Sequence, residues 1–382
     1  MKLALVGEWL SSNLGDRAIG DALAISVTDL GHQVAMVDLS ARESSAMSTQ
    51  ASGVGFAVGR LPAPVYRIKG ALRWRLTERR RSRSYFKSQT ADVDGVLIGG
   101  GQLLADHFLN FPRRIALLCH ALSESQLRYG FVSCGMGELS APARDMLKPA
   151  IASAEFVGLR DALSRDRFLA QFPGFQEKAI YTPDAAILQL ASGKPREKGA
   201  PGLGVIAKNK VSAFLPELAG WSDARYTNYW VEVASVMANP DGAVTVFSNG
   251  EPADRGLAEL VAERLVAGGM APTVRFPMRL EELVSTIETC SYVVAARLHA
   301  VLLALRADVP AVGIEWDPKV RSVLSEFGQE HRCIKFSDDV TQLQAQLRKL
   351  HDLEAASEFR CMLEHARSSL RCNLAEFIEV VR

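Results

Sequence analysis

Residues 292–319 read YVVAARLHAVLLALRADVPAVGIEWDPK and decide the fold class. β-branched and apolar residues at 292–295 and at 311–314 predict two strands. Apolar residues recur at helical spacing over 298–306, which predicts a helix between the strands. A strand, a crossover helix and a second strand are the repeating unit of a parallel sheet, so the segment predicts an α/β protein.

The same alternation extends over both halves of the sequence. In the first half we predict strands at residues 2–6, 33–37, 95–98, 129–133, 156–159 and 179–181, with helices at 16–30, 113–122, 142–152 and 161–171. In the second half, further strands are predicted at 202–207, 245–248 and 273–276, with helices at 226–237, 254–267 and 280–288. The pattern therefore indicates two Rossmann-like units.

A polar segment separates the two halves. Residues 192–202 contain glycines, prolines and charges, which is typical of a linker. We therefore predict a first domain at 1–191, a linker at 192–202, a second domain at 203–352 and C-terminal helices at 353–382 that pack back on the first domain. Two such domains are expected to face each other across a cleft at the carboxyl ends of their strands, where open α/β sheets bind ligands.

Composition excludes several other classes of protein. The chain has 382 residues, of which 48% are hydrophobic and 23% charged, as in globular proteins with sizeable cores. The net charge of +1 gives no overall attraction to nucleic acid. Six scattered cysteines form no C-x-x-C pair, and no apolar run approaches the roughly 20 residues of a membrane span. We expect a cytoplasmic enzyme without a metal site, and the sequence leaves its oligomeric state open.

Chemistry-bearing residues follow several predicted strands. Arg297 and His299 come after one strand and Lys319 after the next, so two cations and a titratable imidazole are expected at one edge of the second sheet. In the first half, Arg160 follows a strand and could bind phosphate or carboxylate, or pair structurally with Asp161. Loop candidates that could bind a ligand or simply form turns are Asn13, Gly15, Asp16, Gly100, Gly101 and Asp106, with Asp16 expected to cap the helix at 16–30.

These residues stand in motifs that resemble those of the polysaccharide pyruvyltransferase family. The motifs are Asn13-Leu14-Gly15-Asp16, Gly99-Gly100-Gly101, Leu159-Arg160-Asp161, Pro183-Asp184, Arg297-Leu298-His299 and Asp317-Pro318-Lys319-Val320. The family transfers pyruvate from phosphoenolpyruvate to sugars as a cyclic ketal, in exopolysaccharide and cell-surface glycan biosynthesis. Its members resemble glycosyltransferases of the two-domain type called GT-B.

The resemblance implies a role for each matching residue. Arg160, Arg297 and Lys319 would bind the donor with help from the backbone at Leu298, and His299 would transfer a proton. Arg297 and Lys319 would also assist the reaction. Phosphoenolpyruvate would be a co-substrate, and no other cofactor or metal is implied. The acceptor is a saccharide, and whether it is lipid-linked is left open.

Two other functions fit the same pattern. The first alternative is a GT-B glycosyltransferase that uses a nucleotide sugar, because fold alone does not decide function. The second is a catalytically inactive binding protein.

One segment is strongly basic although the net charge of the whole chain is close to zero. Residues 67–87 carry nine Lys and Arg residues with Glu78 opposing them, and Trp74, Tyr85 and Phe86 are interleaved. The segment is typical of an ordinary solvated helix face or of a peripheral contact with the anionic inner face of the cytoplasmic membrane. Nucleic acid is disfavoured because no recognition module accompanies the segment.

Overall fold

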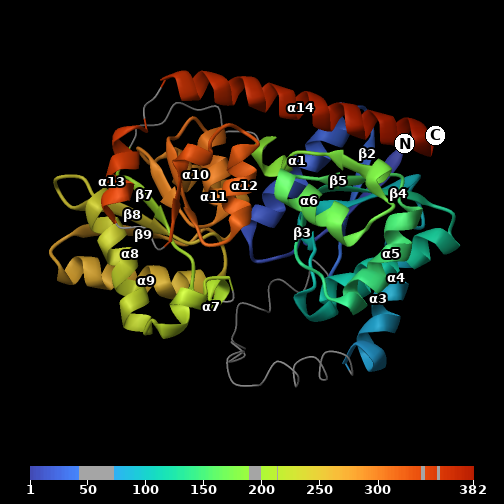
Figure 1. Ribbon diagram of the computed structural model, residues 1–382, viewed down its shortest axis with the longest axis horizontal. Helices are drawn as coiled ribbons and strands as arrows, with labels where there is room; N and C mark the ends of the chain where they lie inside the picture. Colours follow the sequence, from blue (N-terminus) through green and yellow to red (C-terminus); the bar gives the residue numbers. More distant parts are fainter. Residues whose placement is uncertain (43–72, 189–198, 213, 337–339, 351–352) are drawn as a thin grey trace. The chain divides into compact units, whose positions relative to one another are not determined.

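The computed structural model describes residues 1–42, 73–188, 199–212, 214–336, 340–350 and 353–382 (Figure 1). The chain divides into two compact units. Unit 1 comprises Met1–Ser11, Ile19–Ala185 and Ser368–Arg382, and unit 2 comprises Ser12–Ala18 and Ala186–Arg367. Most of the predicted linker, and residues 67–72 of the basic segment, lie outside the described residues.

Unit 1 contains a parallel sheet with the strand order β2-β1-β3-β4-β5-β6 within the described ranges. Its strands are β1 (Lys2–Gly7), β2 (Gln33–Asp38), β3 (Gly95–Leu104), β4 (Arg128–Met136), β5 (Val157–Leu159) and β6 (Ala179–Tyr181). Its helices are α1 (Leu14–Asp29), whose first turn clusters with unit 2, the π-helical turn η2 (Trp74–Glu78), α3 (Arg79–Gln89), α4 (Asn110–Glu124), α5 (Ala141–Ser153) and α6 (Ala162–Gln171). Short 3-10 turns are η3 (His107–Leu109) and η4 (Gln176–Lys178), and η5 (Ala185–Leu188) begins at the last residue of the Ile19–Ala185 segment and continues into unit 2.

Unit 2 contains a second parallel sheet with the order β12-β11-β10-β7-β8-β9, again among described residues. Its strands are β7 (Gly202–Gly204), β8 (Ala243–Phe247), β9 (Ala271–Arg275), β10 (Val293–Ala295), β11 (Ala311–Glu315) and β12 (Cys333–Lys335). Its helices are α7 (Lys208–Val211), η6 (Pro216–Gly220), α8 (Asp223–Met237), α9 (Pro252–Ala267), α10 (Leu280–Glu288), α11 (Leu298–Arg306), α12 (Pro318–Ser325), η7 (Glu330–Arg332), α13 (Val340–Arg348) and the first part of α14 (Leu353–Val381).

Both sheets confirm the predicted Rossmann-like class, and each has one point where the strand order reverses. In unit 1 this point lies between β1 and β3, and in unit 2 it lies between β10 and β7. The loops that leave the strands on either side of a reversal diverge, which opens a crevice at the carboxyl edge of the sheet. In unit 2 the residues that follow β10 and β7 are therefore the first place to look for a ligand site.

The glycine triplet lies inside a strand instead of in a turn. The sequence predicts a strand at residues 95–98, but β3 continues to Leu104 through Gly100 and Gly101, which have φ values of +81° and +72°. The pairing register with β4 shifts between Gly101 and Leu104, as in a bulge. Positive φ is the reason that glycine is required, because other residues rarely adopt it.

The C-terminal residues pack on the sheet of unit 1. Phe377 of α14 makes an edge contact with Phe156 at a ring-centroid distance of 5.7 Å, and the Asn373 side-chain amide donates to the Tyr181 carbonyl at 2.8 Å. Residues 353–381 form one helix, where the sequence predicts C-terminal helices without fixing their number. No helix within the described ranges is long and apolar enough to cross a membrane.

We predict that Gly100→Ala destabilises the protein. A Cβ at this position would lie 2.4 Å from Cγ2 of Ile19, so the substitution combines a disfavoured φ with overpacking. The expected loss is roughly 2 to 4 kcal/mol of unfolding free energy, measured by chemical denaturation.

Gly174→Ala is the matched control, since Gly174 has a φ of +96° but no atom within 4 Å of the point where an added Cβ would stand. It should lose only the roughly 1 to 2 kcal/mol of backbone strain. Equal losses in the two variants would show that close packing at Gly100 is unimportant.

Candidate functional site

The carboxyl edge of the unit 2 sheet gathers polar residues from four neighbouring strands. They follow β11, β10, β7 and β8, which are adjacent in the sheet in that order. Residues 316–319 follow β11, residues 296–299 follow β10, residues 205–210 follow β7 and residues 248–254 follow β8. Two cations and the imidazole predicted from the sequence belong to the first two of these loops.

A partly buried ion pair crosses the reversal point between β10 and β7. Arg297 Nε and Nη2 each lie 2.8 Å from Asp254 Oδ2, and the other carboxylate oxygen of Asp254 accepts from the Ala207 amide at 2.9 Å. Burial raises the pKa of Asp254, although the charge of Arg297 and the hydrogen bonds from Ala207 and Arg297 oppose the shift. The carboxylate therefore ties the loop after β10 to the loop after β7 and sets the direction of the guanidinium.

His299 lies in the first turn of α11 and is 8% exposed. The backbone of Gly15 approaches the imidazole so closely that a Cβ on Gly15 would lie 1.9 Å from His299 Nδ1. Only glycine fits this position without a displacement. The structure thus brings the Asn13-Leu14-Gly15-Asp16 motif and the Arg297-Leu298-His299 motif together inside unit 2.

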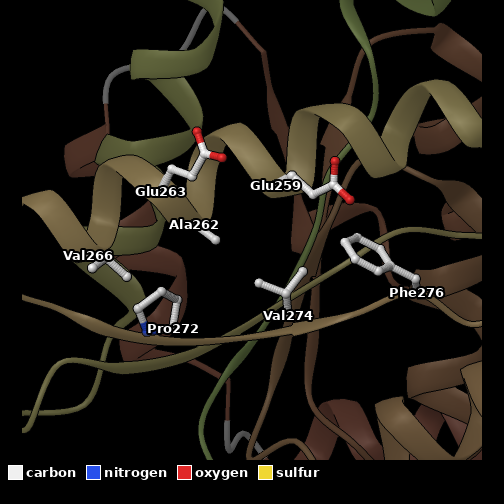
Figure 2. A pocket seen from close by; sticks show the side chains of 7 residues that line it. All are labelled: Glu259, Ala262, Glu263, Val266, Pro272, Val274 and Phe276. Carbon is white, nitrogen blue, oxygen red and sulfur yellow. The ribbon is translucent and has the colours of Figure 1, made fainter.

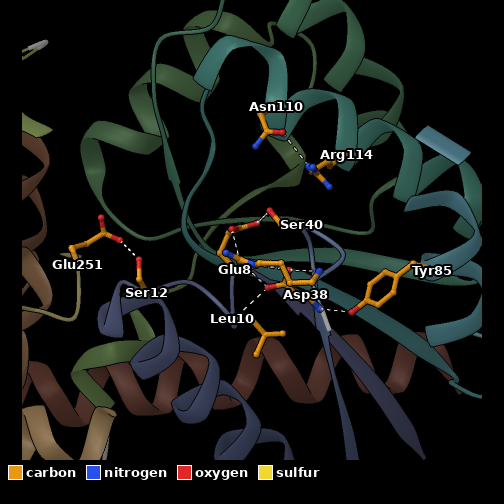
Figure 3. Close-up of polar contacts among 10 residues, drawn as sticks. Glu8, Leu10, Ser12, Asp38, Ser40, Tyr85, Asn110, Arg114 and Glu251 are labelled. Atoms are coloured by element: carbon orange, nitrogen blue, oxygen red, sulfur yellow. Dashed lines mark hydrogen bonds and ion pairs between the residues drawn. The ribbon is translucent and has the colours of Figure 1, made fainter. Parts of the chain in front are cut away.

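Residues 12–15 are bound to the loop after β8. The Leu14 amide donates to the Asn249 carbonyl at 3.1 Å, and Asn249 Nδ2 donates to Asn13 Oδ1 at 2.9 Å. Ser12 Oγ donates to Glu251 Oε1 (Figure 3). These contacts explain how a segment from the start of the chain is held beside His299.

The helix after this segment begins at Leu14, two residues before the predicted start. Asn13 Oδ1 accepts from the Gly15 amide at 3.2 Å, so Asn13 provides the capping oxygen and Asp16 lies within the first turn. The prediction that Asp16 caps this helix is therefore wrong.

Glu251 connects this segment to a further cation. Its Oε2 lies 2.6 Å from Nζ of Lys210 in the short helix α7, which follows β7. Burial by itself would raise the pKa of Glu251, but the hydrogen bonds from Lys210 and Ser12 and the charges of Lys210 and Arg297 lower it overall. These interactions favour the ionised carboxylate of Glu251, and the charge of Arg297 is one of the causes that lower its pKa.

Lys319 lies in the first turn of α12, which follows β11, and its ammonium group lies beside aromatic rings. Its ammonium group is 4.4 Å from the ring centroid of Trp316 and 5.6 Å from that of Phe214, and it lies 3.3 Å from Asp317 Oδ2. The indole N–H of Trp316 donates to the Ala296 carbonyl at 2.8 Å. This bond joins the Lys319 loop to the loop that carries Arg297.

Arg160 lies in unit 1 at the end of β5 and is 3% exposed. Its Nε is 3.2 Å from Asp161 Oδ2 and its Nη1 is 3.1 Å from Asp184 Oδ2. Asp161 Oδ1 also caps α6 by accepting from the Ser164 amide at 2.8 Å. These contacts match the structural pairing that the sequence left open, and donor binding by Arg160 stays a prediction.

The other loop candidates also lie in unit 1. Gly100 packs against Trp9 and Ile19, and Gly101 pairs with Cys134 in the sheet. Asp106 accepts from the Leu109 amide at 2.8 Å and from the Ser140 amide at 3.2 Å, so it links two loops. Acceptor binding by these residues stays a prediction.

Two sets of polar residues were not predicted from the sequence. One set lies in unit 2 and consists of Lys210, Asn249, Glu251 and Asp254. The feature of the sequence that could have identified these residues is their position directly after the strands β7 and β8. The other is in unit 1, where Arg42 binds Asp38 at 2.8 Å and Glu8 at 2.7 Å, and Ser40 donates to Glu8 (Figure 3). Both sets follow parallel strands, as ligand-binding residues in such sheets often do.

No group of three potential metal ligands occurs among the residues that the structure describes. A separate groove of about 470 Å³ lies between α9 and β9 and is lined by Val266, Val274, Phe276 and two glutamates (Figure 2). None of its lining residues belongs to the four loops. We therefore place the candidate site at the carboxyl edge of the unit 2 sheet.

Solved structures with the same fold define the broader class. The chain resembles UDP-GlcNAc 2-epimerase from Neisseria meningitidis bound to UDP-GlcNAc, with a TM-score of 0.57, 9% identity, and coverage of 100% of this chain and 99% of that chain. It also resembles UDP-GlcNAc 2-epimerase from Methanocaldococcus jannaschii, with a TM-score of 0.57, 9% identity and coverage of 94% and 98%. A glycosyltransferase from Rickettsia africae has a TM-score of 0.51, 10% identity and coverage of 100% and 97%. The fold is thus GT-B-like.

Residues 13–318 match the family described as polysaccharide pyruvyl transferase. Because the match covers most of the sequence, the chain belongs to this enzyme family, as the motifs predicted. A search of curated proteins found no match.

We predict that Gly15→Ala displaces residues 12–15 from their site. The new methyl group would overlap the imidazole of His299, so the hydrogen bond from the Leu14 amide to Asn249 should weaken. Hydrogen exchange of peptides that span residues 12–18 should become faster. Gly256→Ala is the control, since no atom lies within 4 Å of a Cβ there and its exchange at 12–18 should be unchanged.

We also predict that Arg160→Ala strongly destabilises unit 1. The substitution leaves the buried carboxylates of Asp161 and Asp184 without this cation, which costs roughly 3 to 5 kcal/mol. Thermal unfolding measures the effect. Arg165→Ala, on the exposed surface of α6, should change stability by less than about 0.5 kcal/mol. An Arg160→Ala variant as stable as Arg165→Ala would contradict the structural role.

Proposed function

We propose that this enzyme transfers pyruvate from phosphoenolpyruvate to two hydroxyls of one sugar residue, forming a cyclic ketal in a cell-surface glycan or exopolysaccharide. Family membership supports an enzyme with a saccharide acceptor. The single observation that carries the finer proposal is the arrangement of Arg297, His299 and Lys319 at the ends of the neighbouring strands β10 and β11.

The donor is an anion with a phosphate and a carboxylate, and unit 2 offers matching groups. Arg297 provides a planar guanidinium fork that is oriented by Asp254. Lys319 provides an ammonium on the next loop. Leu298 and His299 begin α11, and the N-terminal end of a helix favours anions.

The reaction needs an acid. Protonation of the methylene carbon of phosphoenolpyruvate produces a methyl group and a cation at the adjacent carbon, which the first sugar hydroxyl attacks. The C–O bond to phosphate then breaks, and the second hydroxyl attacks the same carbon to close the ketal. The two hydroxyl protons balance the proton used at carbon and the proton carried away on phosphate.

His299 is the proposed acid. Gly15 allows the N-terminal segment to cover the imidazole, and low exposure limits access of water to the site. Asp254, Glu251 and Asn249 would hold the surrounding loops in position.

A nucleotide-sugar glycosyltransferase is the second candidate, since one of the solved structures with this fold is a glycosyltransferase. Calorimetric titration distinguishes the two functions. We expect phosphoenolpyruvate to bind in the absence of a nucleotide, whereas binding of a UDP-sugar without any binding of phosphoenolpyruvate would favour the second candidate.

We predict that His299→Ala loses turnover and keeps donor binding. A positioned acid raises the rate roughly a hundredfold to ten-thousandfold and contributes little to ground-state binding. Phosphate release with phosphoenolpyruvate and a panel of galactosides, glucosides and mannosides measures turnover. Undiminished release by this variant would exclude His299 as the acid. His331→Ala, at an exposed histidine after α12, is the control and should behave as wild type.

We further predict that Arg297→Ala and Lys319→Ala weaken donor binding. A hydrogen bond to a charged group is worth roughly 1.5 to 3 kcal/mol, so each variant should lose about one to two orders of magnitude in affinity. Calorimetry with phosphoenolpyruvate measures the loss. Arg255→Ala, an exposed arginine on α9, should bind normally. Wild-type affinity in both site variants would contradict the anion site.

A further inference from the structure

The helix formed by η2 and α3 has one side fixed in unit 1. Phe86 is fully buried, and the Tyr85 hydroxyl accepts from the Asp38 amide at 3.1 Å (Figure 3). The Arg114 guanidinium lies 5.7 Å from the Trp74 ring centroid. The aromatic residues that the sequence suggested as part of an outer surface therefore pack inward, and the opposite side of the helix faces out.

The helix carries four exposed arginines, which we call the arginine face: Arg75, Arg79, Arg80 and Arg81. Because Arg79, Arg80 and Arg81 are consecutive, their side chains spread over roughly half of the helix circumference. The nearby acidic residues bind other cations. Glu124 pairs with Arg83 at 2.6 Å and Lys87 at 2.9 Å, and Glu78 pairs with Arg73 at 2.6 Å. No ion pair to the arginine face occurs among the described residues.

Two further features accompany this charge. Leu76 lies next to Arg75 in the sequence and is 68% exposed, so the helix also presents an apolar side chain. A cavity of about 450 Å³ is lined by Arg81, Ser84, Tyr85, Ser88 and Gln89. A guanidinium with neighbouring hydroxyl and amide groups is suited to a phosphate head group.

We propose that the arginine face and Leu76 dock unit 1 on an anionic lipid bilayer. A bilayer could interact with the arginines, with Leu76 and with the polar cavity at the same time. Guanidinium groups are attracted to its negative charge, Leu76 enters the interface, and the polar cavity accepts a lipid phosphate. A nucleic acid would use the charge alone and leave the exposed leucine without a role.

Sedimentation with vesicles tests the proposal on the whole chain. Binding is expected with vesicles of phosphatidylcholine and phosphatidylglycerol, to be absent with phosphatidylcholine alone, and to weaken as salt increases. Since each basic residue near such a surface contributes about 1 kcal/mol, the triple variant Arg79→Gln/Arg80→Gln/Arg81→Gln should bind about a hundredfold more weakly. Leu76→Gln should also reduce binding.

The matched control removes the same charge from exposed positions elsewhere. Arg165→Gln/Arg348→Gln/Arg371→Gln should bind vesicles as wild type does. Equal binding by the two triple variants would overturn the proposal, as would binding to neutral vesicles or stronger binding to an RNA oligonucleotide. Phosphate release with a soluble acceptor should be the same in both triple variants, so this result is separate from the test of catalysis.

Discussion

The close approach of the Gly15 backbone to the imidazole of His299 is the constraint on which the site depends. It is possible only without a side chain at position 15. It also requires the segment around Asn13 to be held in place. Asn249 and Glu251, which follow β8, hold this segment through hydrogen bonds. Four loops from adjacent strands and one segment from the start of the chain are thus held in a single arrangement.

Two arginines illustrate how position alone does not determine a role. Arg160 and Arg297 each follow a buried strand of a parallel sheet. Arg160 binds two buried carboxylates and is 3% exposed, whereas the side chain of Arg297 binds one and is 15% exposed. A guanidinium between two carboxylates belongs to a group with net negative charge, whereas a guanidinium with a single carboxylate belongs to a neutral pair.

The sequence was sufficient for the fold class because strands and helices alternate with distinct periodicity. It also located Arg297, His299 and Lys319, since residues after parallel strands share one edge of a sheet. It could not show that β3 continues through Gly100 and Gly101, because glycines usually indicate a turn and here permit a bulge. Asp254 and Glu251 were missed for a related reason: carboxylates after a strand look like ordinary loop residues until their partners are known.

The stacking of Lys319 on Trp316 has an optical consequence. Indole emission responds to a charge held against the ring, and the Trp316 N–H is itself anchored to the carbonyl of Ala296. An anion that draws the ammonium away would alter this electric field. Trp316 is therefore an intrinsic fluorophore at the point where the two loops meet.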